Sequence, residues 1–330
     1  MPLRVAVQMD PLESIRIAGD SSFALMEAAQ ARGHTLYHYD VGSLAWESDG
    51  SPRGRITAIA RPVTVKRVEG DHFRAEDPRR IDLARDIDVV LMRQDPPFDL
   101  GYISAAFLLD RLRGETLVVN DPREVVNAPE KMFVLDYARY MPPTLIARTL
   151  DDVKAFQRDI ADEFPGGLVV KPLHGNGGKA IFHIGPDGKN LSALFEVFNQ
   201  TWPEPHMVQP FLPEVAEGDK RIVLVDGEVA GAINRFPGEG EFRSNLAQGG
   251  HAESATLTAR EEEICAAMGP ELRRRGLVFV GIDVIGGKWL TEINVTSPTG
   301  IVAIDKFNGT DTAGMIWDAI ERRHAAMGST

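Results

Sequence analysis

The first third of the chain alternates apolar segments with an amphipathic one, and this order limits the possible folds more than any other feature. LRVAVQM, TLYHYD, IDVVLMR and TLVVN have the pattern of short strands. DSSFALMEAAQARG, between the first two, has the pattern of a helix that Asp20 or Ser21 begins and Gly33 ends. Alternating strands and helices predict an α/β layer with a largely parallel, Rossmann-like sheet. The turn after the first strand, DPLESIRIAGD, lacks a glycine fingerprint, so we expect no dinucleotide there.

Two loops of this region follow strands directly, MDP at 9–11 and RQDPPFD at 93–99. In open α/β sheets, ligands bind at the carboxyl ends of the strands, so Asp10, Arg93 and Asp95 are candidate substrate contacts. The prolines leave an equal alternative, in which both loops are only stiff turns.

The length of 330 residues is too great for one small core. The pattern changes at NDPREVVNAP, residues 120–129, where we place a domain boundary; a helix, PEKMFVLDYARY, and an α+β block follow. A third block begins near MVQPFLP. We therefore expect three units, residues 1–125, 126–205 and 206–330. Within the third, the glycine-rich stretch 236–254 suits a functional lid better than a linker.

Charge and cysteine content exclude several classes of protein. The net charge of −12 disfavours a protein that lives on nucleic acid or on anionic membranes. No apolar run approaches membrane-spanning length, and the first residues read as a strand rather than a secretion signal. One cysteine, Cys265, excludes internal disulfides and agrees with a reducing cytoplasm. It lies beside Ile264 and Met268 in a helical pattern, which favours a buried residue over a nucleophile.

The stretch VVKPLHGNGGKAIFHI, residues 169–184, places three glycines between two strand-like segments. The common nucleotide loops run from a strand into a helix. Here KAIFHI alternates like a strand, which predicts a β-hairpin with a glycine-rich tip between Lys171 and Lys179. Such a tip either cradles an anion with its backbone N–H groups or is a plain mobile turn.

The stretch GIDVIGGKWLTEINVTSP, residues 281–298, predicts a second hairpin. If its two central glycines form a two-residue turn, Asp283 pairs with Leu290. Alternation then places Asp283, Glu292 and Asn294 on one face, which Leu290 shares. Two carboxylates and an amide oxygen side by side repel without a cation, and oxygen ligands suit Mg²⁺. The alternative is a solvated strand face.

Several of these segments together resemble the ATP-grasp fold: KPLHGNGG, MVQPFLP, EGDKRIVLVDGE and DVIGGKWLTEINVTSPTG. Within that fold the chain is most similar to the bacterial glutathione synthetases, on VVLMRQDPPFD, PEKMF, FPGEGEFRSNLAQGG and EINVTSP. The resemblance runs from residue 9 to the last helix. It implies a Rossmann-like substrate domain (1–125), a lid subdomain with the glycine-rich hairpin (126–205) and a C-terminal subdomain with a magnesium site and a substrate lid loop (206–330), the last two clamping ATP.

The resemblance also implies roles for individual residues. The implied ATP-binding residues are Lys131, Lys171, Gly175, Asn176, Gly177, Gly178, Gln209, Phe211, Leu212, Asp219 and Lys220. The implied metal ligands are Asp283, Glu292 and Asn294. The arginines implied for substrate carboxylates and an acyl phosphate are Arg221, Arg235 and Arg243. The implied substrate residues are Asp10, Arg93, Asp95, Asn245, Ser297 and Thr299.

Three residues depart from the family pattern, Pro210, His174 and Asn176. Pro210 has no N–H to donate, so main-chain contacts to adenine must come from its neighbours. His174 stands in the glycine loop where many relatives carry an acid, and we expect it to be a solvent-exposed residue of the loop tip.

The reaction implied by the resemblance is the ligation of γ-glutamylcysteine and glycine to glutathione, through an acyl phosphate made from ATP. The implied cofactors are ATP and Mg²⁺ or Mn²⁺, the partners are small molecules rather than nucleic acid or membrane, and the assembly is a cytoplasmic homotetramer. Another ATP-grasp ligase, with a glutamate or D-alanine acceptor, is the first alternative. A non-catalytic ATP-binding module is the second, and the intact set of lysines and magnesium ligands disfavours it.

Overall fold

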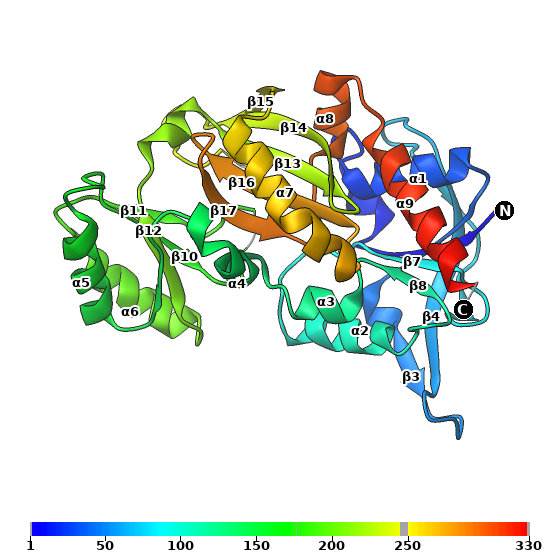
Figure 1. The fold of residues 1–330 in the computed structure, drawn as a ribbon. Coiled ribbons are helices and arrows are strands. Elements are labelled where there is room, and N and C mark those ends of the chain that lie inside the picture. The colour runs from blue at the N-terminus through cyan, green and yellow to red at the C-terminus, as the bar shows by residue number, and fades with distance from the viewer. Residues whose placement is uncertain (1, 176, 245–249, 329–330) are drawn as a thin grey trace.

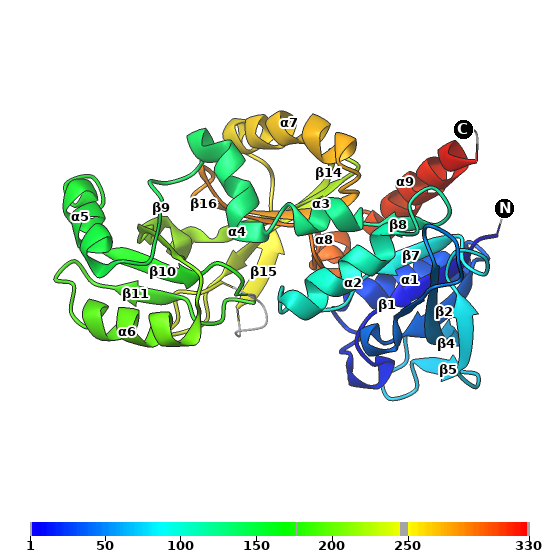
Figure 2. The same cartoon turned by 90° about the horizontal axis from the view of Figure 1, so that it is seen from below.

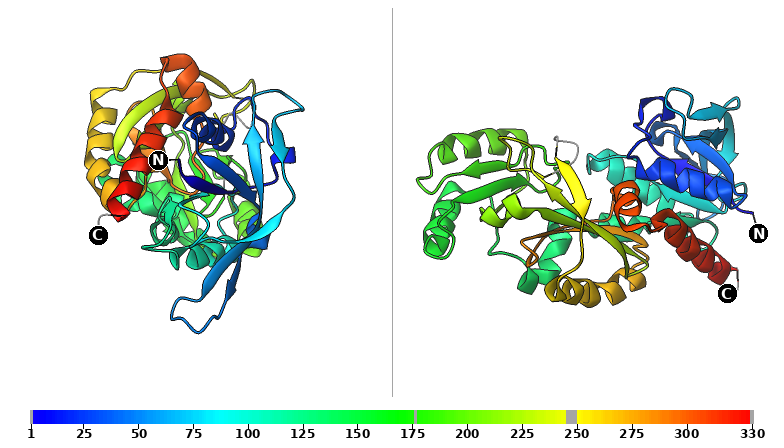
Figure 3. Two further views of the ribbon diagram at one scale, coloured as in Figure 1. Left: turned by 90° about the vertical axis from the view of Figure 1, so that its right-hand side faces the viewer. Right: turned by 90° about the horizontal axis from the view of Figure 1, so that it is seen from above.

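The structure is a computed structural model that describes residues 2–175, 177–244 and 250–328. Its strands form three sheets that follow one another along the molecule (Figure 1). The N-terminal sheet lies at one end, the sheet of the glycine-rich hairpin at the other, and the third sheet between them, as the views from below and above also show (Figures 2 and 3). The α/β class expected from the sequence is confirmed.

The strands are β1 (Arg4–Gln8), β2 (Thr35–Tyr39), β3 (Ala45–Glu47), β4 (Arg55–Val65), β5 (Phe73–Ala75), β6 (Arg79–Asp82), β7 (Val89–Met92), β8 (Leu117–Val119), β9 (Leu145–Ala147), β10 (Leu168–Pro172), β11 (Phe182–Ile184), β12 (His206–Pro210), β13 (Asp219–Val225), β14 (Glu228–Phe236), β15 (His251–Ser254), β16 (Phe279–Ile285) and β17 (Trp289–Asn294). The α-helices are α1 (Ser21–Ala31), α2 (Leu100–Asp110), α3 (Pro122–Val126), α4 (Glu130–Phe133), α5 (Leu150–Ile160), α6 (Leu191–Thr201), α7 (Ala259–Arg274), α8 (Ile301–Asn308) and α9 (Thr312–Met327). Short 3₁₀ turns cover Leu12–Ser14, Val41–Ser43, Val134–Tyr140 and Pro213–Glu217. The single helix expected over PEKMFVLDYARY is therefore α4 followed by a 3₁₀ segment.

The N-terminal sheet has the strand order β3-β4-β2-β1-β7-β8. Its centre is parallel, as predicted, because β1 pairs in parallel with β2 and β7, and β7 with β8. The segments β3 to β6 add an antiparallel extension that the sequence analysis missed. The helix α1 packs on the face that carries Val5 and Val7, whereas α2 packs on the face that carries Ala6 and Val90. The order of strands therefore reverses between β1 and β7, which creates a crevice at their carboxyl ends.

The second sheet has the order β11-β10-β12-β9 and is antiparallel. The helices α5 and α6 bury their apolar sides against it, with Phe195 and Phe198 at the centre of this small core. β12 lies beyond the boundary that we expected at residue 205, yet it is hydrogen-bonded to β10. The second sheet therefore extends to Pro210, because the strand after α6 returns to pair with the hairpin strand.

The third sheet has the order β15-β14-β13-β16-β17. α7 packs against one of its faces, and α8 and α9 lead from it back to the N-terminal unit (Figure 1). Trp317 of α9 is fully buried and donates its indole N–H to the Leu25 carbonyl of α1 at 2.8 Å. One apolar cluster contains residues of both α1 and α9, so the first and third units share a core. None of the helices in the described ranges is both long and apolar enough to cross a membrane.

The one cysteine of the sequence lies in α7, as expected. Cys265 is 4% exposed, and burial raises the pKa of its thiol to about 12. Since the thiolate is the reactive form, raising the pKa lowers the reactive fraction at pH 8 by roughly 10³-fold relative to an ordinary thiol. We expect a disulfide reagent such as DTNB to label the native protein at least about 10²-fold more slowly than the same protein in urea. Rapid stoichiometric labelling under native conditions is the result that contradicts this burial.

Candidate functional site

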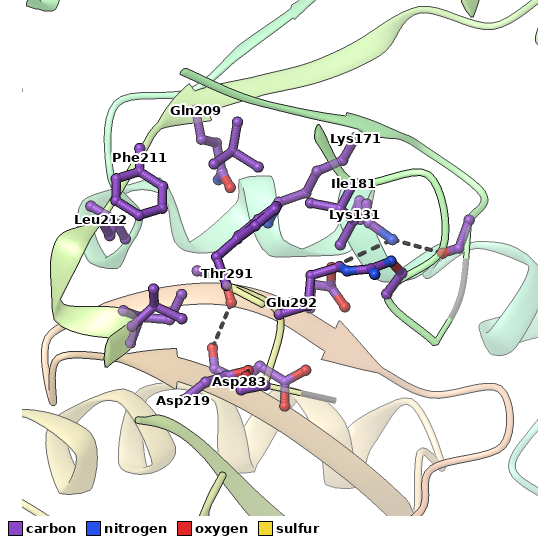
Figure 4. Close-up of a pocket in the computed structure, with 18 of the residues that line it drawn as sticks. Lys131, Lys171, Ile181, Gln209, Phe211, Leu212, Asp219, Asp283, Thr291 and Glu292 are labelled. Carbon is purple, nitrogen blue, oxygen red and sulfur yellow. Dashed lines mark hydrogen bonds and ion pairs between the residues drawn. The ribbon is translucent and has the colours of Figure 1, made fainter. Parts of the chain in front are cut away.

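A cleft of about 820 Å³, including its open mouth, lies between the second and third sheets. This volume is within the range of sites for small ligands. The glycine-rich hairpin borders it on one side, and the strands β16 and β17 border it on the other (Figure 4). The cleft collects residues that are far apart in the sequence, from Lys131 to Glu292.

The predicted hairpin between β10 and β11 is confirmed, with Val169 opposite His183. Its tip contributes Gly175, Gly177 and Gly178 to the cleft. Gly177 and Gly178 have φ values of 60° and 74°, in the left-handed region that favours glycine. The backbone of the tip therefore faces the cleft without a side chain at these two positions, whereas Asn176 lies outside the described residues.

Lys171 and Lys131 both enter the cleft (Figure 4). Lys131 is paired, because its ammonium donates to the Gly175 carbonyl at 2.8 Å and lies 3.5 Å from Glu292. Lys171 is 8% exposed, and its side-chain ammonium makes no hydrogen bond or ion pair with another described residue. Burial lowers its pKa, with the carboxylate of Glu292 opposing that effect. A buried cation that faces a cleft without a partner is matched by an anionic ligand.

The strands β16 and β17 bring the three predicted metal ligands together, but in a different register from the one predicted. Asp283 pairs with Glu292 rather than with Leu290, and the Asn294 amide donates to Asp283 at 3.3 Å. The difference is a β-bulge at Thr291, the residue left without an opposite partner. The bulge turns Leu290 into the core, where it is fully buried, and so the expectation that Leu290 shares the carboxylate face is wrong.

Asp283 forms ion pairs with two arginines, and one of them also donates hydrogen bonds to it. The Arg221 guanidinium donates to both of its oxygens, at 2.6 and 3.1 Å, and Arg235 lies 2.9 Å from it. These cations hold the pKa of Asp283 below its usual value in spite of burial. Arg235 also donates to Asp219 at 2.6 Å, which leaves Asp219 Oδ1 buried without a partner among the described residues.

The connector after β12 lines the cleft through Gln209, Pro210, Phe211 and Leu212. The Phe211 N–H donates to the Gly167 carbonyl at 2.9 Å, so this main-chain group is already used within the protein. Asp219 follows on the cleft side, but Lys220 does not. Successive residues of β13 point to opposite faces, and the Lys220 ammonium instead pairs with Glu261 of α7 at 2.6 Å. The expectation of a ligand contact at Lys220 is therefore not supported by the geometry.

The glycine-rich stretch after β14 reaches the cleft with Phe242, Arg243 and Ser244. Arg243 donates to the Gly178 carbonyl of the hairpin tip at 2.9 Å and pairs with Glu241. The stretch therefore contacts the hairpin directly, and Asn245 lies outside the described residues. His174 is half-buried rather than solvent-exposed, because its ring packs against Phe98 of the N-terminal unit at 5.6 Å, and burial lowers its pKa.

The remaining predicted substrate residues gather at the carboxyl ends of β1 and β7. The Asp95 N–H donates to the Asp10 carboxylate at 3.4 Å. Arg93 donates to Ser22 of α1 and to the Pro298 carbonyl, both at 2.9 Å. Ser297 donates to the Gln94 carbonyl at 2.8 Å, and the Thr299 carbonyl accepts from Arg221 at 3.2 Å. The segment 296–300 thus joins the crevice of the first unit to the carboxylates of the third.

Some residues at the site carried no distinctive signal in the sequence. Thr291 lines the cleft only because of the bulge, and Phe242 and Ser244 reach it from the irregular stretch. Glu130 was also absent from the predicted site residues, although it directly precedes Lys131, which was among them. Its carboxylate accepts from Thr296 at 2.8 Å, and burial raises its pKa.

Comparison with protein families accounts for nearly the whole chain. The model of the prokaryotic glutathione synthetase N-terminal domain matches residues 3–125, and the model of the ATP-grasp domain of the same enzymes matches residues 130–309. The chain belongs to the prokaryotic glutathione synthetase family. It is 52% identical over 325 residues to the glutathione synthetase of Rhodopseudomonas palustris, which covers 98% of this chain and 100% of that protein. It is 41% identical to that of Shewanella oneidensis, covering 97% of this chain and 99% of that protein.

Solved structures of lower identity share the fold. A D-cycloserine synthetase is 18% identical with a TM-score of 0.65 and covers 97% of this chain and 99% of its own. A RimK domain ATP-grasp protein from Sphaerobacter thermophilus is 19% identical with a TM-score of 0.61 and covers 96% and 98%. These likenesses establish the ATP-grasp fold for a chain of the glutathione synthetase family, and no more than the fold.

Proposed function

We propose that this chain ligates γ-glutamylcysteine and glycine to glutathione with the use of ATP. Membership of the glutathione synthetase family over nearly the whole chain supports this activity. One structural observation supports it most directly: the buried Lys171 ammonium has no partner among the described residues and lines the same cleft as the glycine-rich tip. A cation and a backbone nest on one cleft suit a polyphosphate.

The positions of the residues around the cleft suggest which part of the substrates each of them contacts. Lys131, Lys171 and the N–H groups of the tip hold the ATP phosphates, and the segment Gln209–Leu212 lines the place for adenine. Asp219 lines the cleft as well, and we assign it to the ribose. Arg221 and Arg235 are buried beside Asp283, and Arg243 closes against the hairpin. We assign these arginines to the charge that develops on the acyl phosphate and its carboxylate precursor.

A divalent cation fits the oxygen atoms of Asp283, Glu292 and Asn294, with the unpartnered Asp219 oxygen nearby. Among the described residues no group of three His, Cys, Asp or Glu side chains is arranged to hold a metal by itself. The carboxylates of Asp219, Asp283 and Glu292 also face four cationic side chains, Lys131, Lys171, Arg221 and Arg235. Such a site suits Mg²⁺ or Mn²⁺ that arrives with the nucleotide, since Mg²⁺ is commonly held by one or two carboxylates together with phosphates. When bound, the cation supplies charge neutralisation for phosphoryl transfer.

The chemistry needs two bond exchanges and no protein nucleophile. An oxygen of the cysteinyl carboxylate forms a bond to the terminal phosphorus of ATP as the bond to ADP breaks. The glycine amine then bonds to the acyl carbon, the carbon–oxygen bond to phosphate breaks, and the amine loses a proton. The protein positions the reactants and excludes water from the acyl phosphate, a task that suits the contact between Arg243 and the hairpin tip.

The direct test is phosphate release by the purified protein with ATP and Mg²⁺, given γ-glutamylcysteine with or without glycine. We expect release that requires both substrates and a product with the mass of glutathione. Release only with another amino acid or dipeptide contradicts the substrate assignment and keeps the ligase chemistry. ATP binding without release under any of these conditions supports the non-catalytic alternative instead.

Three further features belong to this proposal. We assign the substrate domain, the lid subdomain and the C-terminal subdomain to residues 1–125, 126–205 and 206–330 as functional units, with β12 completing the lid sheet. We expect a homotetramer and a cytoplasmic location, as the family resemblance implies. Sedimentation of the purified protein tests the assembly.

A further inference from the structure

The cleft between the second and third sheets has an apolar end and a charged end. Phe211 and Leu212 lie at the apolar end, whereas Lys131 and Lys171 lie at the charged end (Figure 4). A planar base suits the first end, and phosphates suit the second. Phe242 also lines this cleft, and it has none of the roles proposed above.

The ring of Phe242 lies against the apolar end. Its centroid is 6.2 Å from that of Phe211 and 6.0 Å from that of His183, edge-on in both contacts. His183 in turn stacks on Phe211 at 4.0 Å, and its imidazole is hydrogen-bonded to the Gly166 carbonyl at 2.8 Å. The three rings therefore form one cluster, of which Phe211 and Phe242 line the cleft.

The residues next to Phe242 fix its place along the cleft. The Glu241 carboxylate accepts from the N–H groups of Phe242 and Arg243 at 2.9 and 3.3 Å. The Arg243 side chain donates to a carbonyl of the hairpin tip at 2.9 Å. The Ser244 hydroxyl donates to Asp219 at 2.7 Å. Three consecutive residues thus face the connector, the tip and Asp219, the groups that we assign to adenine, phosphates and ribose.

Folding alone does not explain an aromatic residue at this position. Phe242 follows the polar sequence GEGE and precedes an arginine and a serine. It is half-buried and lies outside the three apolar clusters of the described residues. A large aromatic side chain that lines a cleft without joining a core is typical of a binding contact. The other explanation is that the ring only anchors its own stretch to Phe211.

We propose that Phe242 packs on the adenine base of ATP at the apolar end of the cleft, together with Phe211. This assignment rests on the proposed use of ATP, and it adds a base contact from a stretch otherwise assigned to substrate carboxylates. Packing of a base on an aromatic ring removes apolar surface of both from water. The contact therefore strengthens the binding of nucleotides and leaves the binding of a bare phosphate chain unchanged.

The test compares two ligands on four proteins by calorimetry with Mg²⁺. The ligands are ATP and inorganic tripolyphosphate, which has three linked phosphates and neither ribose nor base. The proteins are the wild type, Phe242→Ala, Phe242→Tyr and Phe236→Ala. Phe236 is the matched control, because it belongs to the same stretch but stacks on His251 at 5.1 Å and does not line the cleft. Circular dichroism checks that each variant is folded.

We expect Phe242→Ala to raise Kd for ATP by about 5- to 100-fold, the size of a lost base–aromatic contact. Its Kd for tripolyphosphate should stay within about twofold of the wild-type value. Phe242→Tyr should bind both ligands as the wild type does, because it keeps the face of the ring. Phe236→Ala should keep the wild-type ratio of the two constants.

Four outcomes overturn the assignment. If Phe242→Ala weakens both ligands by the same factor, the ring only anchors its stretch. If the variant weakens neither, the ring does not contact the base. If Phe242→Tyr loses as much as Phe242→Ala, the face of the ring is not what binds. If Phe236→Ala changes the ratio equally, the effect belongs to the whole stretch.

The same measurements separate this assignment from the proposed function. Tight ATP binding by a wild-type protein that makes no glutathione contradicts the proposed function and leaves the role of Phe242 standing. A wild-type protein that does not bind ATP contradicts both.

Discussion

Replacing Lys171 by methionine is expected to lower kcat by about 10²–10³-fold and to raise KM for ATP, while the unliganded protein becomes no less stable. The loss in rate follows from the proposed role of Lys171, because a cation at this place would stabilise the transferring phosphoryl group. The undiminished stability is expected because the Lys171 ammonium has no ion pair among the described residues, and an unpaired buried charge opposes folding. Initial rates and a thermal unfolding curve without nucleotide measure the two effects.

Lys189→Met is the matched control for this change. Lys189 belongs to the same sheet unit, but its side chain is 83% exposed and pairs with the exposed Asp187. We expect the rate to stay within about twofold and the stability to change by less than about 0.5 kcal/mol. A Lys171→Met protein that keeps its rate contradicts the phosphate role. One that loses several degrees of melting temperature shows instead that Lys171 stabilises the unliganded fold.

The predicted stability of Lys171→Met depends on which groups the Lys171 ammonium contacts, and the sequence does not show this. The alternation of VVKP within a strand indicates only that Lys171 points away from Val170. Whether its ammonium meets a carboxylate depends on residues far along the chain, such as Asp219 and Glu292, and Glu292 pairs with Lys131 instead. Local pattern therefore predicted the hairpin and the residue, while the tertiary fold decided its partners.

Where the sequence analysis failed, long-range contacts outweighed local pattern. The bulge at Thr291 reverses the faces of one strand, because a single extra residue shifts everything before it by one position. Lys220 belongs to a segment typical of the family, yet strand alternation aims it at Glu261, 41 residues further on. His174 packs against Phe98, which lies in another unit of the fold. The antiparallel strands β3 to β6 were missed because their charged, largely exposed residues carry a weak apolar pattern.

Asp283 and Glu292, both predicted as metal ligands, differ in their burial and in their contacts within the unliganded fold. Asp283 is 4% exposed and receives hydrogen bonds or ion contacts from Arg221 and Arg235. Glu292 has an 18% exposed side chain and, within the described part of the chain, one ion pair, to Lys131 at 3.5 Å. We therefore expect metal binding to need both carboxylates, and the stability of the unliganded fold to depend mainly on Asp283.

Asp283→Asn is accordingly expected to lower the free energy of unfolding by about 3–5 kcal/mol, because it leaves two buried guanidinium groups without their shared carboxylate. Glu292→Gln is expected to lower it by less than Asp283→Asn does, since the ion pair of Glu292 with Lys131 is longer, at 3.5 Å, and the Glu292 side chain is 18% exposed. Both should lower kcat by at least about 10²-fold and raise the Mg²⁺ concentration needed for half-maximal rate. Unfolding curves without nucleotide measure the contribution of each carboxylate to stability, and Mg²⁺ titrations of the rate measure its contribution to metal binding. Equal destabilisation by both variants contradicts the assignment of the structural duty to Asp283, and an unchanged Mg²⁺ requirement in Glu292→Gln contradicts the metal site.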